Sequence, residues 1–153
     1  MADRFMRAAI DEARDGIRHG EGGPFGAVIV KDGKIVGRGH NRVLLKKDPT
    51  CHGETEAIRS ACAELDTYDL SGCEIYTTAE PCPMCLGAIM WANIGKVYYG
   101  CGRLDTEKIG FRDNKFYDFL DGRGDVLDIS ELDRGECMNV FDEYSANDDK
   151  KIY

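Results

Sequence analysis

Two short segments constrain the fold of this 153-residue chain more than any other feature, because together they carry the ligands of one metal site. The first segment contains His52 and, shortly after it, Glu54, and the second contains Cys82 and Cys85. Two cysteines at this spacing lie one helical turn apart, so both sulfurs can reach the same ion. One imidazole and two thiolates are typical zinc ligands. Any fold of this chain must therefore bring these two distant segments together.

Three protein ligands leave the fourth tetrahedral position of zinc open for water, which is typical of a catalytic zinc rather than a structural one. A carboxylate beside the metal can take a proton from that water and pass it to a leaving group. We therefore predict that His52, Cys82 and Cys85 bind one Zn²⁺ per subunit and that Glu54 is the catalytic acid and base. The pattern H-x-E followed by P-C-x-x-C indicates hydrolytic removal of an amino group from a nucleobase.

Two other interpretations of the cysteine pair remain open. It could be a thioredoxin-like redox pair, although redox activity needs neither His52 nor Glu54. It could also be half of a closed structural zinc site, for which Cys51 is the tempting fourth ligand. Because Cys51 and His52 are adjacent at the start of a helix, their side chains would point differently. We expect the nearby Glu56 on a solvated helix face, and Glu80 in the loop before the cysteine helix.

The net charge of −8 bears on the class of substrate. A protein that grips a nucleic acid usually presents a basic patch to the phosphates. Here the stretch from 118 to 149 is dominated by acidic residues. RNA or DNA is therefore disfavoured as a partner, whereas a neutral base imposes no such requirement.

Length and cysteine usage predict the general class of protein. A chain of this length fits one domain, residues 1–153, with an ordinary core. Its seven cysteines show no small-scaffold spacing, so a reducing compartment is favoured over a disulfide framework. We find no apolar run of membrane-spanning length and no signal-peptide pattern in residues 1–9. We therefore expect a cytoplasmic protein with no membrane partner.

Hydrophobic periodicity and turn residues predict the order of elements. We expect helices at about 3–19, 52–65, 83–93 and 137–146, and strands at about 25–31, 35–41, 74–78, 96–100 and 126–129. The helix at 83–93 is apolar nearly all round and is expected to be buried. This order predicts an α/β fold, a three-layer α/β/α sandwich with a mixed central sheet. The two motif helices would begin at one end of that sheet, where their N-termini favour thiolates.

Beyond the zinc motifs, the chain resembles the cytidine deaminase-like superfamily, and more closely its small guanine deaminase branch. The resemblance covers most of the chain. It rests on residues 23–30, His40-Asn41, 48–50, the two zinc motifs with Trp91, 110–113, 116–117 and 150–153. The Gly-Phe-x-Asp segment and the terminal aromatic residue are the specific part of this resemblance.

The resemblance implies a set of substrate contacts. Asn41 and Glu54 would contact the base, while Asp113 and Tyr153 would help to hold guanine. Phe25 and Trp91 would wall the pocket by stacking. Simpler roles remain open for these residues other than Glu54. Asn41 could be a turn residue, Asp113 a helix cap and Tyr153 a frayed terminus. Phe25 and Trp91 could be plain core residues.

The family also implies a homodimer. Its members exchange the C-terminal segment, which here corresponds to about 131–153, so that this segment closes the partner's site. Tyr153 would then act in trans.

Two residues depart from the commonest family pattern. Gly53 makes the first motif His-Gly-Glu, which resembles fungal-type cytosine deaminases, and Cys51 precedes the zinc ligand. We expect both at the rim of the pocket. The leading hypothesis is deamination of guanine to xanthine and ammonia. The alternatives are deamination of cytosine, isocytosine or an aminotriazine, a tRNA adenosine deaminase, and a non-catalytic zinc-stabilised interaction module.

Overall fold

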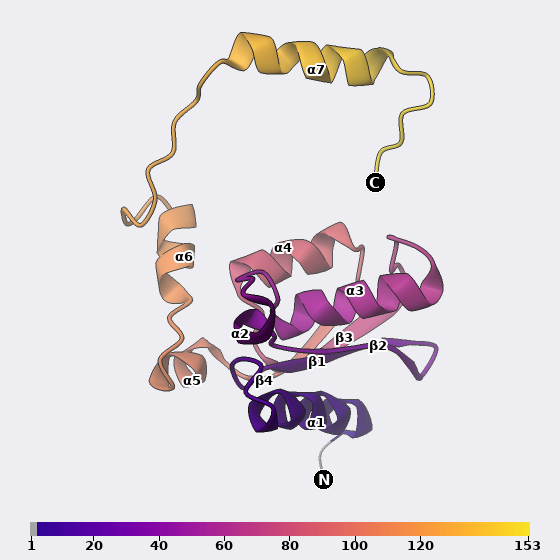
Figure 1. Cartoon of the computed structure of the whole chain (residues 1–153), viewed down its shortest axis with the longest axis vertical. Coiled ribbons are helices and arrows are strands. Elements are labelled where there is room, and N and C mark those ends of the chain that lie inside the picture. Colours follow the sequence, from indigo (N-terminus) through magenta and orange to yellow (C-terminus); the bar gives the residue numbers. More distant parts are fainter. Residues whose placement is uncertain (1–2) are drawn as a thin grey trace.

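The computed structural model describes residues 3–153, which form a mixed four-stranded sheet between helical layers (Figure 1). The strands are β1 (Gly26–Lys31), β2 (Lys34–His40), β3 (Cys73–Ala79) and β4 (Lys96–Cys101), in the order β2-β1-β3-β4. β1 is antiparallel to both of its neighbours, and β3 is parallel to β4. The predicted three-layer α/β/α sandwich with a mixed central sheet is confirmed.

Helices cover both faces of the sheet. α1 (Arg4–Arg18) lies on one face, and α3 (Gly53–Leu65) and α4 (Pro83–Trp91) lie on the other (Figure 1). Successive side chains of β1 point to opposite faces. Val28 therefore packs in the cluster under α1, while Ile29 packs in the cluster under α3 and α4. This two-sided burial explains why β1 is a continuous apolar run.

Two glycines of β2 let α3 lie unusually close to the sheet. A Cβ on Gly37 or Gly39 would overlap the backbone of Ala57, in the middle of α3. A larger residue at either position would therefore lift the helix from the strand. Since His52 immediately precedes α3, this close approach fixes the first half of the metal site against the sheet.

The chain after β4 departs from the layered body. α5 (Arg103–Lys108) and α6 (Asn114–Leu120) lie beside the sheet, whereas α7 (Arg134–Ala146) extends well away from it (Figure 1). Every residue from 121 to 153 is exposed except the half-buried Met138. A helix of this length that buries so little is marginal on its own in water. Its exposed apolar residues, among them Val140 and Phe141, therefore require a covering surface.

Two sequence-based predictions of local structure are wrong. The expected strand at 126–129 does not form, because no neighbouring strand is in reach of this extended segment. The helix beginning at Pro83 was expected to be buried on all sides, yet Met90 and Trp91 are 64% and 70% exposed. In the single chain this face is contacted at Trp91 by Tyr153 but remains largely exposed. The short helices α2 (Val43–Lys46) and α5 were not predicted.

None of the helices within residues 3–153 is both long enough and apolar enough to cross a bilayer.

Candidate active site

His52, Cys82 and Cys85 form a cluster of metal-binding atoms where two helices begin. His52 and Cys82 occupy the N-cap positions of α3 and α4, and Cys85 lies in the first turn of α4. Their nitrogen and sulfur atoms all lie within 4.8 Å of one another, and His52 Nδ1 lies 3.6 Å from Cys82 Sγ. Tetrahedral zinc, with Zn–S near 2.3 Å and Zn–N near 2.0 Å, separates its ligand atoms by roughly 3.5–3.8 Å. The geometry therefore fits a zinc ion bound through Nδ1 and two sulfurs.

The two thiols of the cluster differ in acidity. A hydrogen bond from Cys85, with a further contribution from His52, lowers the pKa of Cys82 to about 4 against the opposing effect of burial. The same hydrogen bond, together with burial, raises the pKa of Cys85. Cys82 is thus a ready thiolate, while metal binding must displace the proton of Cys85.

Cys51 does not belong to this cluster. It is buried, its Sγ lies 3.7 Å from Arg59 Nη1, and it is not among the residues whose ligand atoms gather at the metal-binding cluster. A closed site that uses Cys51 as a fourth ligand is therefore unsupported. Three protein ligands leave one tetrahedral position for water or substrate, as in catalytic zinc sites.

Glu54 is buried beside the cysteines. Its side chain lies in the first turn of α3 and is 6% exposed, with Oε2 3.5 Å from Cys85 Sγ. Burial raises the pKa of this carboxyl above its ordinary value. A carboxyl group with a raised pKa accepts a proton more readily than an ordinary carboxylate and can return it, which is the property of a general acid and base.

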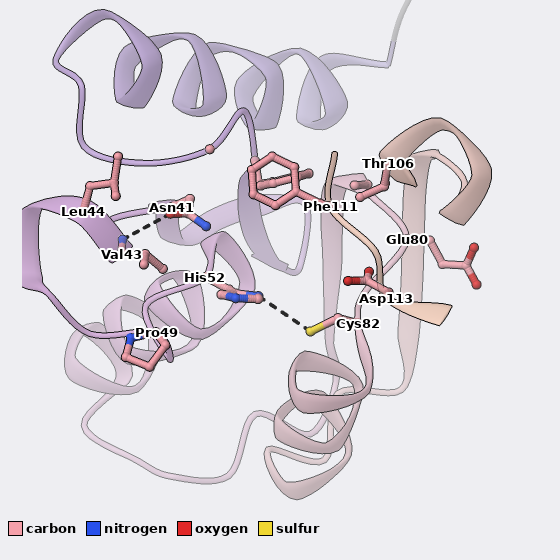
Figure 2. A pocket seen from close by; sticks show the side chains of 13 residues that line it. Asn41, Val43, Leu44, Pro49, His52, Glu80, Cys82, Thr106, Phe111 and Asp113 are labelled. Carbon is pink, nitrogen blue, oxygen red and sulfur yellow. Dashed lines mark hydrogen bonds between the residues drawn. The ribbon is translucent and has the colours of Figure 1, made fainter. Parts of the chain in front are cut away.

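A cavity of about 280 Å³ opens directly beside His52 and Cys82 (Figure 2). This volume is close to the lower end of the range for small-molecule pockets, roughly 300–1,000 Å³. Its lining consists of Gly23, Phe25, Asn41, Val43, Leu44, Pro49, His52, Ala79, Glu80, Cys82, Thr106, Phe111 and Asp113. The wall is thus mostly apolar, with a few polar groups near the metal cluster. Such a pocket suits a small, flat ligand.

Phe25 and Phe111 form one wall of the cavity. Their ring centroids lie 5.0 Å apart, with the planes at 84°, an edge-to-face arrangement. Phe25 was predicted from the sequence as a pocket residue, whereas Phe111 was given no role of its own. The available signal was its place in the segment Gly110-Phe111-Arg112-Asp113, whose acidic residue was already a candidate.

Asn41 and Asp113 approach the cavity from opposite sides (Figure 2). Asn41 follows β2 and is 5% exposed, and its Oδ1 accepts a hydrogen bond of 3.1 Å from Val43 N–H. Asp113 occupies the N-cap position of α6, yet within residues 114–120 no backbone N–H of this helix donates a hydrogen bond to its carboxylate. Burial, and then the charge of Cys82, raise the pKa of Asp113. The carboxylate therefore faces the cavity rather than the helix.

The loop that carries Asp113 is tied to the cysteine loop. Tyr117 O–H donates to the Pro81 carbonyl at 3.2 Å, and the Arg103 guanidinium stacks on the Tyr117 ring at 4.2 Å. Arg103 also pairs with Glu80 at 3.2 Å. Glu80 lies in the loop between β3 and α4, as expected. These contacts couple the position of Asp113 to that of the zinc ligands.

Trp91 and Tyr153 lie outside the pocket of their own chain. Trp91 ends α4, at the opposite end from Cys82, and is not among the residues that line the cavity. Tyr153 is 73% exposed and its ring centroid lies 5.9 Å from that of Tyr68. Within the single chain Trp91 therefore does not line the cavity, because the length of α4 separates it from Cys82.

Three further expectations about neighbouring residues are corrected. Glu56 was expected on a solvated face but is 7% exposed, with Lys46 Nζ at 2.7 Å and Arg59 Nη1 at 2.6 Å. The unpredicted α2 supplies Lys46 and covers this face. Cys51 and Gly53 were expected at the pocket rim, but both are buried and neither lines the cavity. A Cβ on Gly53 would meet the carbonyl oxygen of Phe25 at 3.1 Å, on the sheet side of the helix.

Beside the cavity, a wider groove of about 850 Å³ continues along α6. It shares Pro49, His52, Cys82, Phe111 and Asp113 with the cavity and runs as far as Val126 and Leu127. The cavity is therefore open on this side in the single chain.

Comparisons with known proteins agree with this geometry. Residues 1–101 match the family model described as the cytidine and deoxycytidylate deaminase zinc-binding region. The chain is 48% identical over 153 residues to a guanine deaminase of Bacillus subtilis, an alignment that covers 99% of the chain and 98% of that protein. The X-ray structure of guanine deaminase from Bacillus subtilis superposes with a TM-score of 0.92 and 40% identity, covering 100% of this chain and 99% of that one.

A second group of relatives matches over a shorter range. A tRNA-specific adenosine deaminase of Aquifex aeolicus is 46% identical over 95 residues, which covers 62% of this chain and 62% of that protein. The similarity to guanine deaminase thus includes the C-terminal third of the chain. The alignment with the Aquifex aeolicus protein, in contrast, does not extend over the whole chain.

Proposed function

The chain belongs to the zinc-dependent cytidine and deoxycytidylate deaminase family, and from this premise we propose that it hydrolyses guanine to xanthine and ammonia. The observation that carries the proposal is the full-length similarity to guanine deaminase, which includes the segment after residue 101. The tRNA-specific adenosine deaminases match either over a shorter range, as in Aquifex aeolicus, or at a lower identity of 34% over 141 residues, as in Buchnera aphidicola. The acid-rich stretch 118–149 would also repel a phosphate backbone.

His52, Cys82 and Cys85 would hold the zinc ion, which when bound would supply an activated water beside the cavity. Glu54, buried next to Cys85, would transfer the protons: it would accept one from the water and deliver it to the ring nitrogen N3, next to the carbon that carries the amino group. Glu54 would then transfer the second water proton to the departing amino group, which would leave as ammonia while the water oxygen becomes the new oxo group of xanthine.

The pocket residues would hold the base in a fixed position relative to the Glu54 carboxyl group. Asp113 can accept hydrogen bonds from the N–H groups of guanine, since an ionised carboxylate is an acceptor only. Asn41 presents an amide to the opposite side of the ring. Phe25 and Phe111 would pack against the ring system. The small cavity volume and the edge-to-face phenylalanine wall support this arrangement.

The same proposal includes a homodimer that exchanges its C-terminal segment, about 131–153. Its support is the exposure of α7 together with the exposed apolar face of α4 and the open groove beside the cavity. Each of these surfaces needs a cover that one chain does not provide. Because Trp91 and Tyr153 contact each other outside their own pocket, both would serve the pocket of the partner subunit.

A cytoplasmic location and a role in purine metabolism complete the proposal. All seven cysteines lie within the described residues and are free thiols, which suits a reducing compartment.

A substrate panel tests the proposed reaction. Zinc-loaded protein is incubated with guanine, cytosine, isocytosine, adenine and ammeline, and ammonia release is measured. We expect release from guanine, and a fall of at least about 100-fold in kcat for Glu54→Ala, the usual size of a general acid–base contribution. Glu64→Gln, an exposed position on the same helix, is the matched control and should keep wild-type turnover. Turnover of another ring in place of guanine would contradict the proposed substrate.

A further inference from the structure

A chain of charged side chains lies behind the wall of the pocket. His40, at the end of β2, is buried, and its two ring nitrogens face two carboxylates. Nδ1 lies 3.0 Å from Glu12 Oε2, and Nε2 lies 2.6 Å from Glu21 Oε2. Each ring nitrogen of His40 is thus occupied by a carboxylate of a different element, so the imidazole is held between α1 and the loop that follows it.

Glu21 contacts more residues around His40 than Glu12 does. The same Oε2 that accepts from His40 also accepts from Arg42 Nε at 3.1 Å. Its backbone carbonyl accepts from the N–H groups of Leu44 and Leu45, both at 3.1 Å. The hydrogen bond from His40, stronger here than the opposing effect of burial, holds the pKa of Glu21 below its ordinary value. One residue therefore fixes the whole segment from the end of β2 to the start of α2.

Asn41 lies in the middle of that fixed segment. Its backbone N–H donates to the Phe25 carbonyl at 2.9 Å, and its Oδ1 accepts from Val43 N–H at 3.1 Å. The amide oxygen is therefore occupied within the protein. The amide nitrogen is the end directed toward the cavity (Figure 2), so Asn41 offers the ligand hydrogen-bond donors.

The loop after Glu21 supports Asn41 from behind. A Cβ on Gly22 would overlap both Oδ1 and the backbone carbonyl of Asn41. The backbone of Gly22 thus lies directly against the side chain of Asn41, and Glu21 holds that backbone in place.

We infer that Glu21 is a positioning residue of the active site. It fixes Asn41 as a hydrogen-bond donor by binding His40 and Arg42, which precede and follow Asn41 in the chain. This inference rests on the proposed function and adds a basis for substrate choice. The pocket selects a ring that presents an acceptor atom to the Asn41 amide, and guanine carries such acceptors in its ring nitrogens and its oxo group.

A double-mutant cycle tests this role. Glu21→Ala and Asn41→Ala should each lower kcat/KM for guanine by about 10- to 100-fold, the loss expected when a substrate-orienting group is misplaced. If Glu21 acts through Asn41, adding Glu21→Ala to Asn41→Ala costs no more than about a further twofold. Glu21→Gln keeps an oxygen acceptor for both neighbours and should restore most of the lost activity.

Glu12→Ala is the matched control, because Glu12 contacts the other nitrogen of the same histidine but does not bind Arg42. It should lower the thermal midpoint about as much as Glu21→Ala does, while kcat/KM stays within about threefold of wild type. Zinc content should be unchanged in all variants. Should Glu21→Ala not fold, Glu21→Asp withdraws the carboxylate by one methylene and enters the same cycle.

Multiplicative losses in the double variant, or a Glu21→Ala enzyme within twofold of wild type, would overturn the inference. A wild type that deaminates another ring instead of guanine would contradict the proposed substrate. The cycle measured with that ring would still decide the role of Glu21. The two ideas therefore fail separately.

Discussion

Trp91 packs against Tyr153, with ring centroids 6.2 Å apart and ring planes inclined by 54°, so the last residue of the chain contacts the far end of α4 rather than the cavity. In the exchanged dimer proposed above, this aromatic pair belongs to the pocket of the other subunit. A complementation experiment separates that arrangement from a site completed within one chain.

We predict that a mixture of Glu54→Ala and Tyr153→Ala protomers is more active than either parent. In a mixed dimer, the site that keeps Glu54 receives Tyr153 from its partner. With equal amounts and random pairing, about one quarter of all sites are then intact. The measurement is guanine turnover after joint refolding. A mixture of Glu54→Ala with the Glu54→Ala/Tyr153→Ala double variant is the inactive control. Turnover no higher than the sum of the parents would place Tyr153 outside the partner's site.

Gly22→Ala should impair the pocket without affecting the metal. The added methyl group displaces the Asn41 side chain, so we expect kcat/KM for guanine to fall by about 100-fold, as for a misplaced substrate-orienting group. Zinc content, measured by metal analysis, should remain at one ion per chain.

Gly95→Ala is the control for that substitution, because a Cβ there meets nothing within 4 Å and the residue precedes β4, away from the cavity. It should leave kcat/KM unchanged. Normal turnover in Gly22→Ala would show that Asn41 tolerates displacement.

Two cysteine substitutions distinguish a zinc ligand from a cysteine that only neighbours the zinc site. Cys85→Ala removes a metal-binding sulfur, so we expect loss of bound zinc and of turnover. Cys51→Ala alters a buried thiol adjacent to His52 that lies outside the cluster, so zinc content should stay at one per chain. A cost of about 1 kcal/mol in the free energy of unfolding is expected for the lost packing. Loss of zinc in Cys51→Ala would reinstate the closed four-ligand site.

Acid should destabilise the protein in part through Glu56. Although burial opposes ionisation, hydrogen bonds from Lys46 and Arg59 hold the pKa of this carboxyl below its ordinary value. Its contribution is therefore complete above the ordinary carboxyl pKa and is lost as the pH falls through the lower folded-state value. Glu56→Gln should reduce the free energy of unfolding by about 2 kcal/mol at pH 7, the scale of hydrogen bonds to a charged group.

Thermal melts between pH 7 and pH 3 provide the measurement. The difference between wild type and Glu56→Gln should shrink as the pH falls below about 4, since protonated Glu56 resembles glutamine. Glu64→Gln, exposed on the same helix, should parallel wild type throughout. A constant difference across this range would exclude ionisation of Glu56 as its cause.

The sequence predicted best those features that depend on local spacing. The cysteine pair, one turn apart, and the H-x-E motif fixed the metal cluster, and alternating apolar residues fixed β1 and its partners. Features that depend on distant partners were missed. The four-residue α2 has too little periodicity to be recognised, so its cover over Glu56 was not foreseen.

The exposed face of α4 has a different cause. Met90 and Trp91 look like core residues because apolarity alone does not say which chain will bury them. The hydrogen bonds of Glu21 with His40 and Arg42 were also missed. They join a loop to the end of a strand, and these side chains belong to no recognisable sequence motif.

The distribution of the zinc ligands has a thermodynamic consequence. Cys82 and Cys85 stay close together even in an extended chain, but thirty residues separate His52 from Cys82. The unfolded protein can thus hold zinc through the cysteine pair alone, whereas the folded protein adds the imidazole. Preferential binding to the folded state stabilises it by mass action, by at most about 2.7 kcal/mol when free zinc is 100-fold above its dissociation constant, because binding to the unfolded chain reduces the effect. The midpoint of unfolding is therefore a function of the zinc concentration in which the protein is kept.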